Sequence, residues 1–143
     1  MLEKLNILLS DLVVEYHKLQ NFHWYVKGTD FFTVHAKLEE LYNYINGAID
    51  EVAENILMLK GRPAASLKEF LELAHIQEVD NHYHSPQELF KVVIDDFQYI
   101  LDSLIILKNK ADQENQILIS TLMDNYISEF YKTLWMLRQA FEA

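Results

Sequence analysis

Apolar residues recur every three or four positions along four long stretches of the chain, which is the spacing of a helix that buries one face. The first predicted helix covers about Leu2–Lys27 and ends at Gly28. Its apolar stripe consists of Leu5, Leu9, Leu12, Tyr16, Leu19 and Val26. The second begins near Asp30, the expected N-cap, and stops at Gly61. Its stripe consists of Phe31, Val34, Leu38, Leu41, Ile45, Ile49, Val52, Ile56 and Leu59.

Two capping boxes, in which a serine is followed three residues later by a glutamate, mark helix starts further along the chain. They consist of Ser66 with Glu69 and of Ser85 with Glu88, the second pair enclosing Pro86 in the first turn. The first box predicts a short helix over 66–73 inside a long connection, and the second predicts a long helix over about 85–110. The fourth long helix begins near Asp112 or Glu114 and continues to about Phe141.

Four long helices joined by short, long and short links describe a four-helix bundle with one crossover. Each helix would be ~40 Å long at ~1.5 Å per residue. The chain has only three Gly, two Pro and no Cys in 143 residues, which is too few turn formers for a barrel or sandwich of short strands. We therefore predict an all-α, ferritin-like fold in a single domain over 1–143, whose long crossover carries a short extra helix.

Charge and composition bear on nucleic-acid binding, on the kind of metal ligand and on membrane insertion. The formal net charge is −10, which repels the phosphates of nucleic acid. Without cysteine, any metal must be held by histidine and carboxylate. Uncharged runs such as 116–123 are far shorter than the ~20 apolar residues that span a bilayer, and no export signal is recognised. We expect a cytoplasmic protein without a membrane partner.

Histidines lie only in the first two helices and in the crossover. Their positions are 17, 23, 35, 75, 82 and 84. A di-iron site inside one bundle needs a Glu-x-x-His pair on each of two helices. The only such pair here is Glu72 with His75, in the short helix and its end. A metal site within a single bundle is therefore not expected. His17 and His75 are predicted to be surface or capping residues, and His82 and His84 either solvated residues of the crossover or ligands of a surface metal site.

Two pairs of side chains remain as candidate metal ligands. His23 and His35 flank Gly28, so an antiparallel hairpin brings them side by side, either as core histidines or as ligands. Asp50 and Glu54 share one face of the second helix, either as a solvated face or as ligands. His35 and Asp50 lie ~22 Å apart along that helix, so they cannot bind the same ion in one subunit.

A two-fold axis between two subunits would bring the histidines and the acids together. If two copies of the second helix pack antiparallel, His35 of one copy lies opposite Asp50 and Glu54 of the other, and two equivalent sites form. The axis would pass near residues 43–44. Gly47 lies close to it, and a glycine inside a helix costs ~1 kcal/mol relative to alanine. Either a close approach of two backbones or ordinary helix packing would account for it.

The chain resembles the Dps family of mini-ferritins over nearly its whole length. The matching segments are His23-Trp24, Val26-Lys27-Gly28, Phe31-Phe32, His35, Glu40-Leu41-Tyr42, Asp50-Glu51, Ala53-Glu54, Gly61-Arg62-Pro63, Leu67-Lys68-Glu69-Phe70 and Trp135-Met136-Leu137-Arg138. The most specific part is the His, His, Asp, Glu set at spacings of 12, 15 and 4 residues.

The resemblance implies a homododecameric shell with ferroxidase centres at its two-fold dimer interfaces. His23 and His35 would supply one half of each centre, and Asp50 and Glu54 of the partner the other half. Such a shell oxidises ferrous iron, generally with hydrogen peroxide, and stores the ferric mineral. Zinc is expected to compete with iron. Trp24 would either wall the site or intercept stray oxidising equivalents.

The chain departs from the family pattern at two places. Asn55 stands where many relatives have arginine. The stretch 116–121 matches the family's acidic pore residues poorly, and Asp112, Glu114 and Asp124 are either substitutes for them or solvated surface residues.

DNA compaction is the first of two alternative functions. Neither end carries a basic extension, so direct DNA binding is not expected, although divalent cations could bridge. The second alternative is a non-catalytic helical interaction module.

Overall fold

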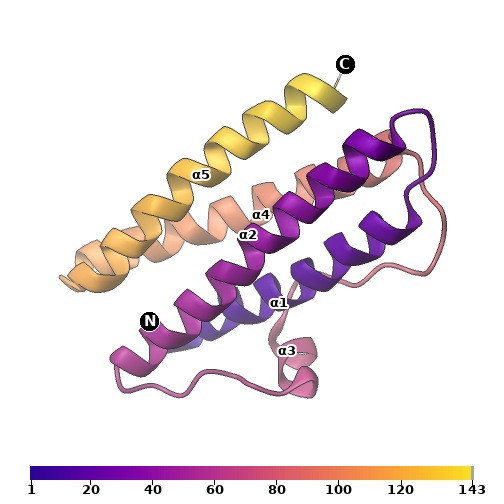
Figure 1. Cartoon of the computed structure of the whole chain (residues 1–143). Helices are drawn as coiled ribbons and strands as arrows, with labels where there is room; N and C mark the ends of the chain where they lie inside the picture. The colour runs from indigo at the N-terminus through magenta and orange to yellow at the C-terminus, as the bar shows by residue number, and fades with distance from the viewer. Residues whose placement is uncertain (143) are drawn as a thin grey trace.

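The computed structural model describes residues 1–142, and in this part of the chain it has five helices and no sheet. The helices are α1 (Leu2–Tyr25), α2 (Phe31–Met58), α3 (Leu67–Leu73), α4 (Pro86–Gln113) and α5 (Ile117–Phe141). Figure 1 shows α1 and α2 as one antiparallel hairpin and α4 and α5 as another, with α3 beside α1 on the crossover that joins them. The all-α four-helix bundle with a single crossover is confirmed.

The predicted stripes form the core. The largest side chains that solvent does not reach come from all four long helices, and they include Phe22, Phe90, Phe97, Phe130, Leu5, Leu38 and Ile56. Burial of this kind contributes roughly 1.5–3 kcal/mol per large apolar side chain. The bundle therefore depends on the same 3–4 periodicity from which its helices were predicted.

Both serine caps are in place. The hydroxyls of Ser66 and Ser85 accept hydrogen bonds from the backbone N–H of Glu69 and Glu88, at 3.2 and 3.3 Å. Each such cap stabilises a helix start by roughly 1 kcal/mol. Asp30 occupies the N-cap position of α2, as predicted, but its side chain makes no capping hydrogen bond. The N–H of Phe31 is bonded to the carbonyl of Gly28.

Two helix boundaries differ from the prediction. α1 ends at Tyr25 rather than near Lys27, because the chain leaves the helix to pair with the crossover: Lys27 N–H donates to the His84 carbonyl and His84 N–H to the Tyr25 carbonyl. α4 continues to Gln113, and α5 begins only at Ile117 rather than near 112–114.

The α4–α5 turn explains the second difference. Asn115 adopts a positive φ of 54°, and its N–H donates to the Asp112 carbonyl while that of Gln116 donates to the Ala111 carbonyl. This is a Schellman ending with asparagine in the left-handed position that glycine more often fills. The same ending closes α2, with Lys60 at φ 62° and Gly61 N–H bonded to Ile56.

Candidate metal half-sites on α1 and α2

The α1–α2 hairpin brings His23 and His35 into direct contact. Their rings stack with centroids 3.6 Å apart and planes 12° apart. Nδ1 of His23 lies 2.7 Å from the carbonyl oxygen of His35, and Nδ1 of His35 lies 2.8 Å from that of His23. A carbonyl only accepts, so both Nδ1 atoms carry the proton and donate it. Both Nε2 atoms therefore keep a lone pair, which is the form of imidazole that binds a metal.

The surroundings of the pair hold it in place. His23 is 5% exposed, and Tyr42 packs edge-on against its ring with centroids 5.4 Å apart. Phe31 stacks on the other side of the pair against His35. Partial burial, followed by the nearby Glu39 carboxylate, raises the pKa of Tyr42, so its hydroxyl remains protonated. The two imidazoles are thus fixed by aromatic packing as well as by hydrogen bonds.

Glu39 is not among the residues that the sequence predicts for the metal site, but it lies next to the imidazole pair. Its Oε1 lies 3.7 Å from Nε2 of His23, on the lone-pair side of the ring, and its side chain is 54% exposed. The signal was available, because Glu39 follows His35 by four residues and therefore shares its helix face. One copy of the chain thus presents the imidazole pair with a carboxylate beside His23, although these three residues do not form a group that could hold a metal ion by themselves.

Asp50 and Glu54 lie on the exposed surface of α2, one turn apart. A hydrogen bond between the two carboxyl groups, and then the charge of Asp50, raise the pKa of Glu54. Two acidic side chains this close disfavour each other's negative charge, and a cation between them relieves that repulsion. The pair is chemically suited to a divalent metal.

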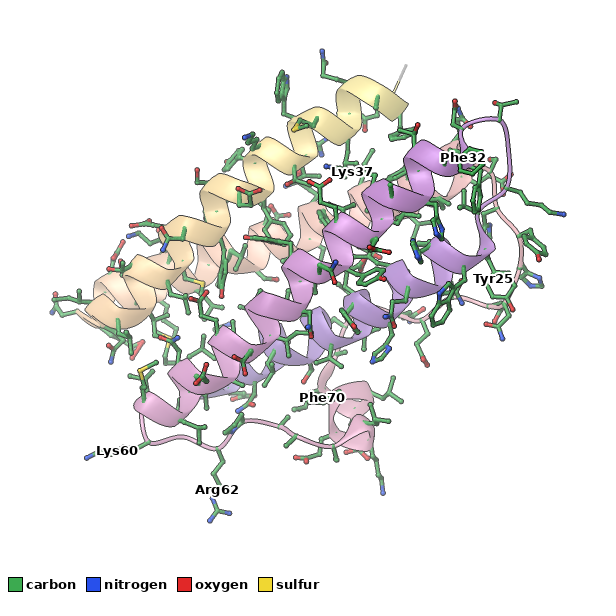
Figure 2. The ribbon with its side chains drawn as sticks, viewed as in Figure 1. Tyr25, Phe32, Lys37, Lys60, Arg62 and Phe70 are labelled. Carbon is green, nitrogen blue, oxygen red and sulfur yellow. The ribbon has the colours of Figure 1, made fainter. Side chains whose placement is uncertain are left out.

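The structure does not bring the histidines and these two acids together within one chain. α2 is one continuous helix, so His35 and Asp50 are ~22 Å apart along its axis. Figure 2 labels Phe32 at the end of the bundle where the imidazoles lie and Lys60 at the opposite end. Within residues 1–142 of a single copy, no group of three or more His, Asp or Glu could hold a metal ion. A complete four-residue site needs a second copy.

The surroundings of Gly47 distinguish the two explanations for this glycine, a close approach of two backbones and ordinary helix packing. In a single copy it is exposed, and a Cβ built on it would have no other atom within 4 Å. Packing inside the subunit therefore does not require this glycine. Trp24 is also unpacked in one copy, with 64% of its surface exposed.

The three acidic residues considered as substitutes for the pore residues, Asp112, Glu114 and Asp124, form ion pairs with lysines. Lys108 Nζ lies 3.0 Å from Asp124 and 3.6 Å from Asp112. Glu114 lies 3.5 Å from Lys110. These contacts give each of the three acids a structural partner at the α4–α5 end of the bundle.

Comparison with known proteins agrees with the observed fold. The ferritin-like domain family matches residues 2–143, so the ferritin-like class is shown. DNA protection during starvation protein 2 of Bacillus anthracis is 39% identical over 137 residues, covering 96% of this chain and 93% of that protein.

Two solved structures are similar to the whole chain. A Dps protein from Bacillus brevis has a TM-score of 0.91 at 37% identity, covering 95% of this chain and 91% of that one. The Dps protein from Vibrio cholerae O1, described as a member of a broad superfamily of ferritin-like diiron-carboxylate proteins, has a TM-score of 0.93 at 33% identity and covers 96% and 86%. The chain belongs to the Dps family of mini-ferritins. None of the helices within residues 1–142 combines the length and apolarity that crossing a membrane needs.

Proposed function

We propose that the protein is a ferroxidase and iron-storage shell that oxidises Fe(II) with hydrogen peroxide and deposits the ferric product inside a dodecamer. The observation that carries this proposal is the imidazole pair. Both Nδ1 protons are donated to main-chain carbonyls, so both Nε2 lone pairs of His23 and His35 are available to a metal.

In the proposed centre, His23 and His35 of one subunit face Asp50 and Glu54 of its partner across a two-fold axis. The imidazoles hold Fe(II) as borderline ligands, and the carboxylate oxygens stabilise the higher charge of Fe(III). Few protein ligands leave coordination positions open for the oxidant and for water. Glu39, whose carboxylate lies 3.7 Å from Nε2 of His23, adds negative charge at that edge of the site and so favours a cation there.

Antiparallel packing of two α2 helices is supported by Gly47. The glycine costs ~1 kcal/mol of helix stability relative to alanine, and nothing in its own subunit occupies the space beside it. A second α2 approaching at this point accounts for both facts, and it places the imidazoles of each copy opposite the acids of the other.

The reaction balances without any further reductant. Two ferrous ions give one electron each to one hydrogen peroxide molecule, whose O–O bond breaks. Both of its oxygens end as oxide or hydroxide bound to Fe(III), and hydrolysis to the mineral releases protons to solvent. The peroxide and the ferrous iron that together would form hydroxyl radical are both consumed.

Anaerobic loading with Fe(II) followed by hydrogen peroxide tests this function. We expect ferric absorbance to rise promptly on peroxide addition, in a particle with the mass of twelve 16.9 kDa chains. Zn²⁺ added first should slow the reaction, because it binds His and carboxylate ligands and has no redox chemistry. A small oligomer that takes up no iron would instead support the helical interaction module.

A further inference from the structure

The closest backbone approach between the two helical hairpins is that of α1 and α4, which pack along one seam. Side chains also join α2 to α5, since the Tyr126 hydroxyl donates to Glu51. The α1–α4 seam is therefore one of the contacts that hold the hairpins together.

Charged side chains are buried in this seam. Asp11, Glu15 and Lys18 on α1 are 1%, 0% and 7% exposed. Asp96 faces them from α4, and Lys18 Nζ lies 2.8 Å from its Oδ2. None of these four residues belongs to the proposed iron site.

Two of the three acids are compensated. Asp11 Oδ1 accepts hydrogen bonds from the backbone N–H of His75 at 2.6 Å and of Ile76 at 2.9 Å, which ties the crossover to α1. Asp96 has the ammonium of Lys18. Glu15 has neither: within the described residues both of its carboxylate oxygens are buried without a hydrogen-bond donor.

An ionised carboxylate buried in this way is strongly disfavoured, and it takes up a proton instead. Burial first, and then the charge of Asp96 together with a hydrogen bond to it, raise the pKa of Glu15 well above its usual range. A bound cation is not the alternative, because residues 1–142 offer no group of three or more ligands within one copy. The protonated carboxyl then donates to Asp96 across the seam.

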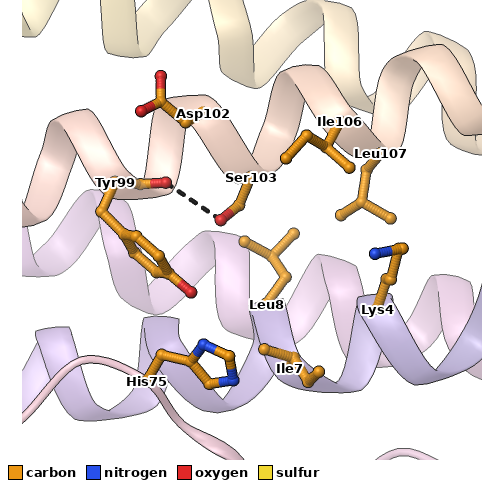
Figure 3. Close-up of a pocket in the computed structure, with 9 residues that line it drawn as sticks. All are labelled: Lys4, Ile7, Leu8, His75, Tyr99, Asp102, Ser103, Ile106 and Leu107. Carbon is orange, nitrogen blue, oxygen red and sulfur yellow. Dashed lines mark hydrogen bonds between the residues drawn. The ribbon is translucent and has the colours of Figure 1, made fainter.

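The other titratable groups around the pair come from α4 and the crossover. Figure 3 shows Tyr99 of α4 and His75 of the crossover at the edge of a surface hollow, with the Tyr99 hydroxyl pointing toward α1. Burial and the neighbouring Asp11 raise the pKa of Tyr99, so the tyrosine adds no negative charge at neutral pH. Asp11 and Lys18 are the charged neighbours on α1.

We propose that Glu15 and Asp96 share one proton across the α1–α4 seam, and that this proton joins the two hairpins, so that its loss weakens the bundle. Without the proton, three carboxylates face one ammonium in a buried space. Because the folded state holds Glu15 protonated more tightly than the unfolded state does, this stabilisation is complete at low pH. It is lost progressively as pH rises from the pKa of a glutamate in the unfolded chain to the raised pKa in the folded state, by up to about tenfold in the folding equilibrium constant per pH unit.

Infrared spectroscopy of the assembled protein in D₂O detects the proton directly. We expect the C=O band of a buried protonated carboxyl at neutral pH and its loss at higher pH, with a thermal midpoint that falls as the pH approaches that point and levels off beyond it. Glu15→Gln should remove the band and this pH-dependent fall in the midpoint, while the exposed Glu3→Gln on the same helix should change neither.

Asp96→Asn provides a second arm, with the exposed neighbour Asp95→Asn as its control. Removing the Asp96 charge should move the loss of the Glu15 band to lower pH, and the control should not. A wild-type spectrum without such a band at neutral pH, or a band that survives in Glu15→Gln, would overturn the proposal even if a variant folded poorly. Neither measurement depends on iron oxidation.

Discussion

His23 and His35 fix each other through the main chain: each imidazole donates its Nδ1 proton to the other residue's carbonyl oxygen, and the rings stack 3.6 Å apart. This reciprocal arrangement crosses the α1–α2 turn. It sets the tautomer of both rings and leaves the two Nε2 atoms as the ring positions that the proposed metal site uses.

Replacing these imidazoles should abolish most of the oxidation. We expect His23→Ala with His35→Ala to slow peroxide-driven Fe(II) oxidation by at least about tenfold, because loss of ligands or of their orienting partners costs at least this much in metal sites. The matched control is His17→Ala, an exposed imidazole on the same helix. Stopped-flow absorbance measures both, and gel filtration checks that assembly is intact. Equal rates in the three proteins would contradict the assignment.

A large side chain at Gly47 should block the dimer without unfolding the subunit. The position has open space in one copy, so Gly47→Trp should keep the helical circular dichroism while lowering the particle mass and the oxidation rate. Asn46→Trp changes the next exposed position, rotated ~100° around the helix, and serves as the control. A full-sized, active Gly47→Trp particle would show that no second backbone approaches here.

DNA should not bind directly at physiological salt. Each chain carries a formal charge of −10, and binding to the phosphate backbone depends on cationic side chains releasing counterions. A gel-shift assay with linear duplex DNA in chelator should show no complex, and the same assay with Mg²⁺ tests bridging by divalent cations. A retarded band in chelator would mean that a local basic surface outweighs the net charge.

Local signals predicted most of the fold. The caps at Ser66 and Ser85 and the apolar stripes describe interactions within one helix or between neighbours three and four residues apart, and the structure contains them. The start of α5 could not be read in this way, because Asn115 takes a left-handed conformation through hydrogen bonds to the end of α4. The position of Asp30 at the N-cap of α2 was predicted correctly, although its side chain makes no capping hydrogen bond.

The polar seam was missed for a different reason. Asp11, Glu15 and Lys18 follow each other at spacings of four and three, which is the helical period of the buried stripe. A search for apolar residues at that period passes over charged ones. Asp96, which pairs with Lys18, lies on the other hairpin, so its proximity depends on the tertiary fold. Glu39 was recognisable as the i+4 neighbour of His35, but its 3.7 Å approach to His23 depends on the α1–α2 turn.

The central claim is that each iron site is divided between two chains, and mixed assemblies test it most directly. One variant carries His23→Ala and His35→Ala, and the other carries Asp50→Asn and Glu54→Gln. A dimer of one with the other regains one intact site, since the histidines of one chain and the acids of its partner are both unchanged. We predict that shells reassembled from equal amounts recover about a quarter of the wild-type sites and oxidation rate, whereas each variant alone is inactive. Reassembled shells as inactive as their parents would contradict the account.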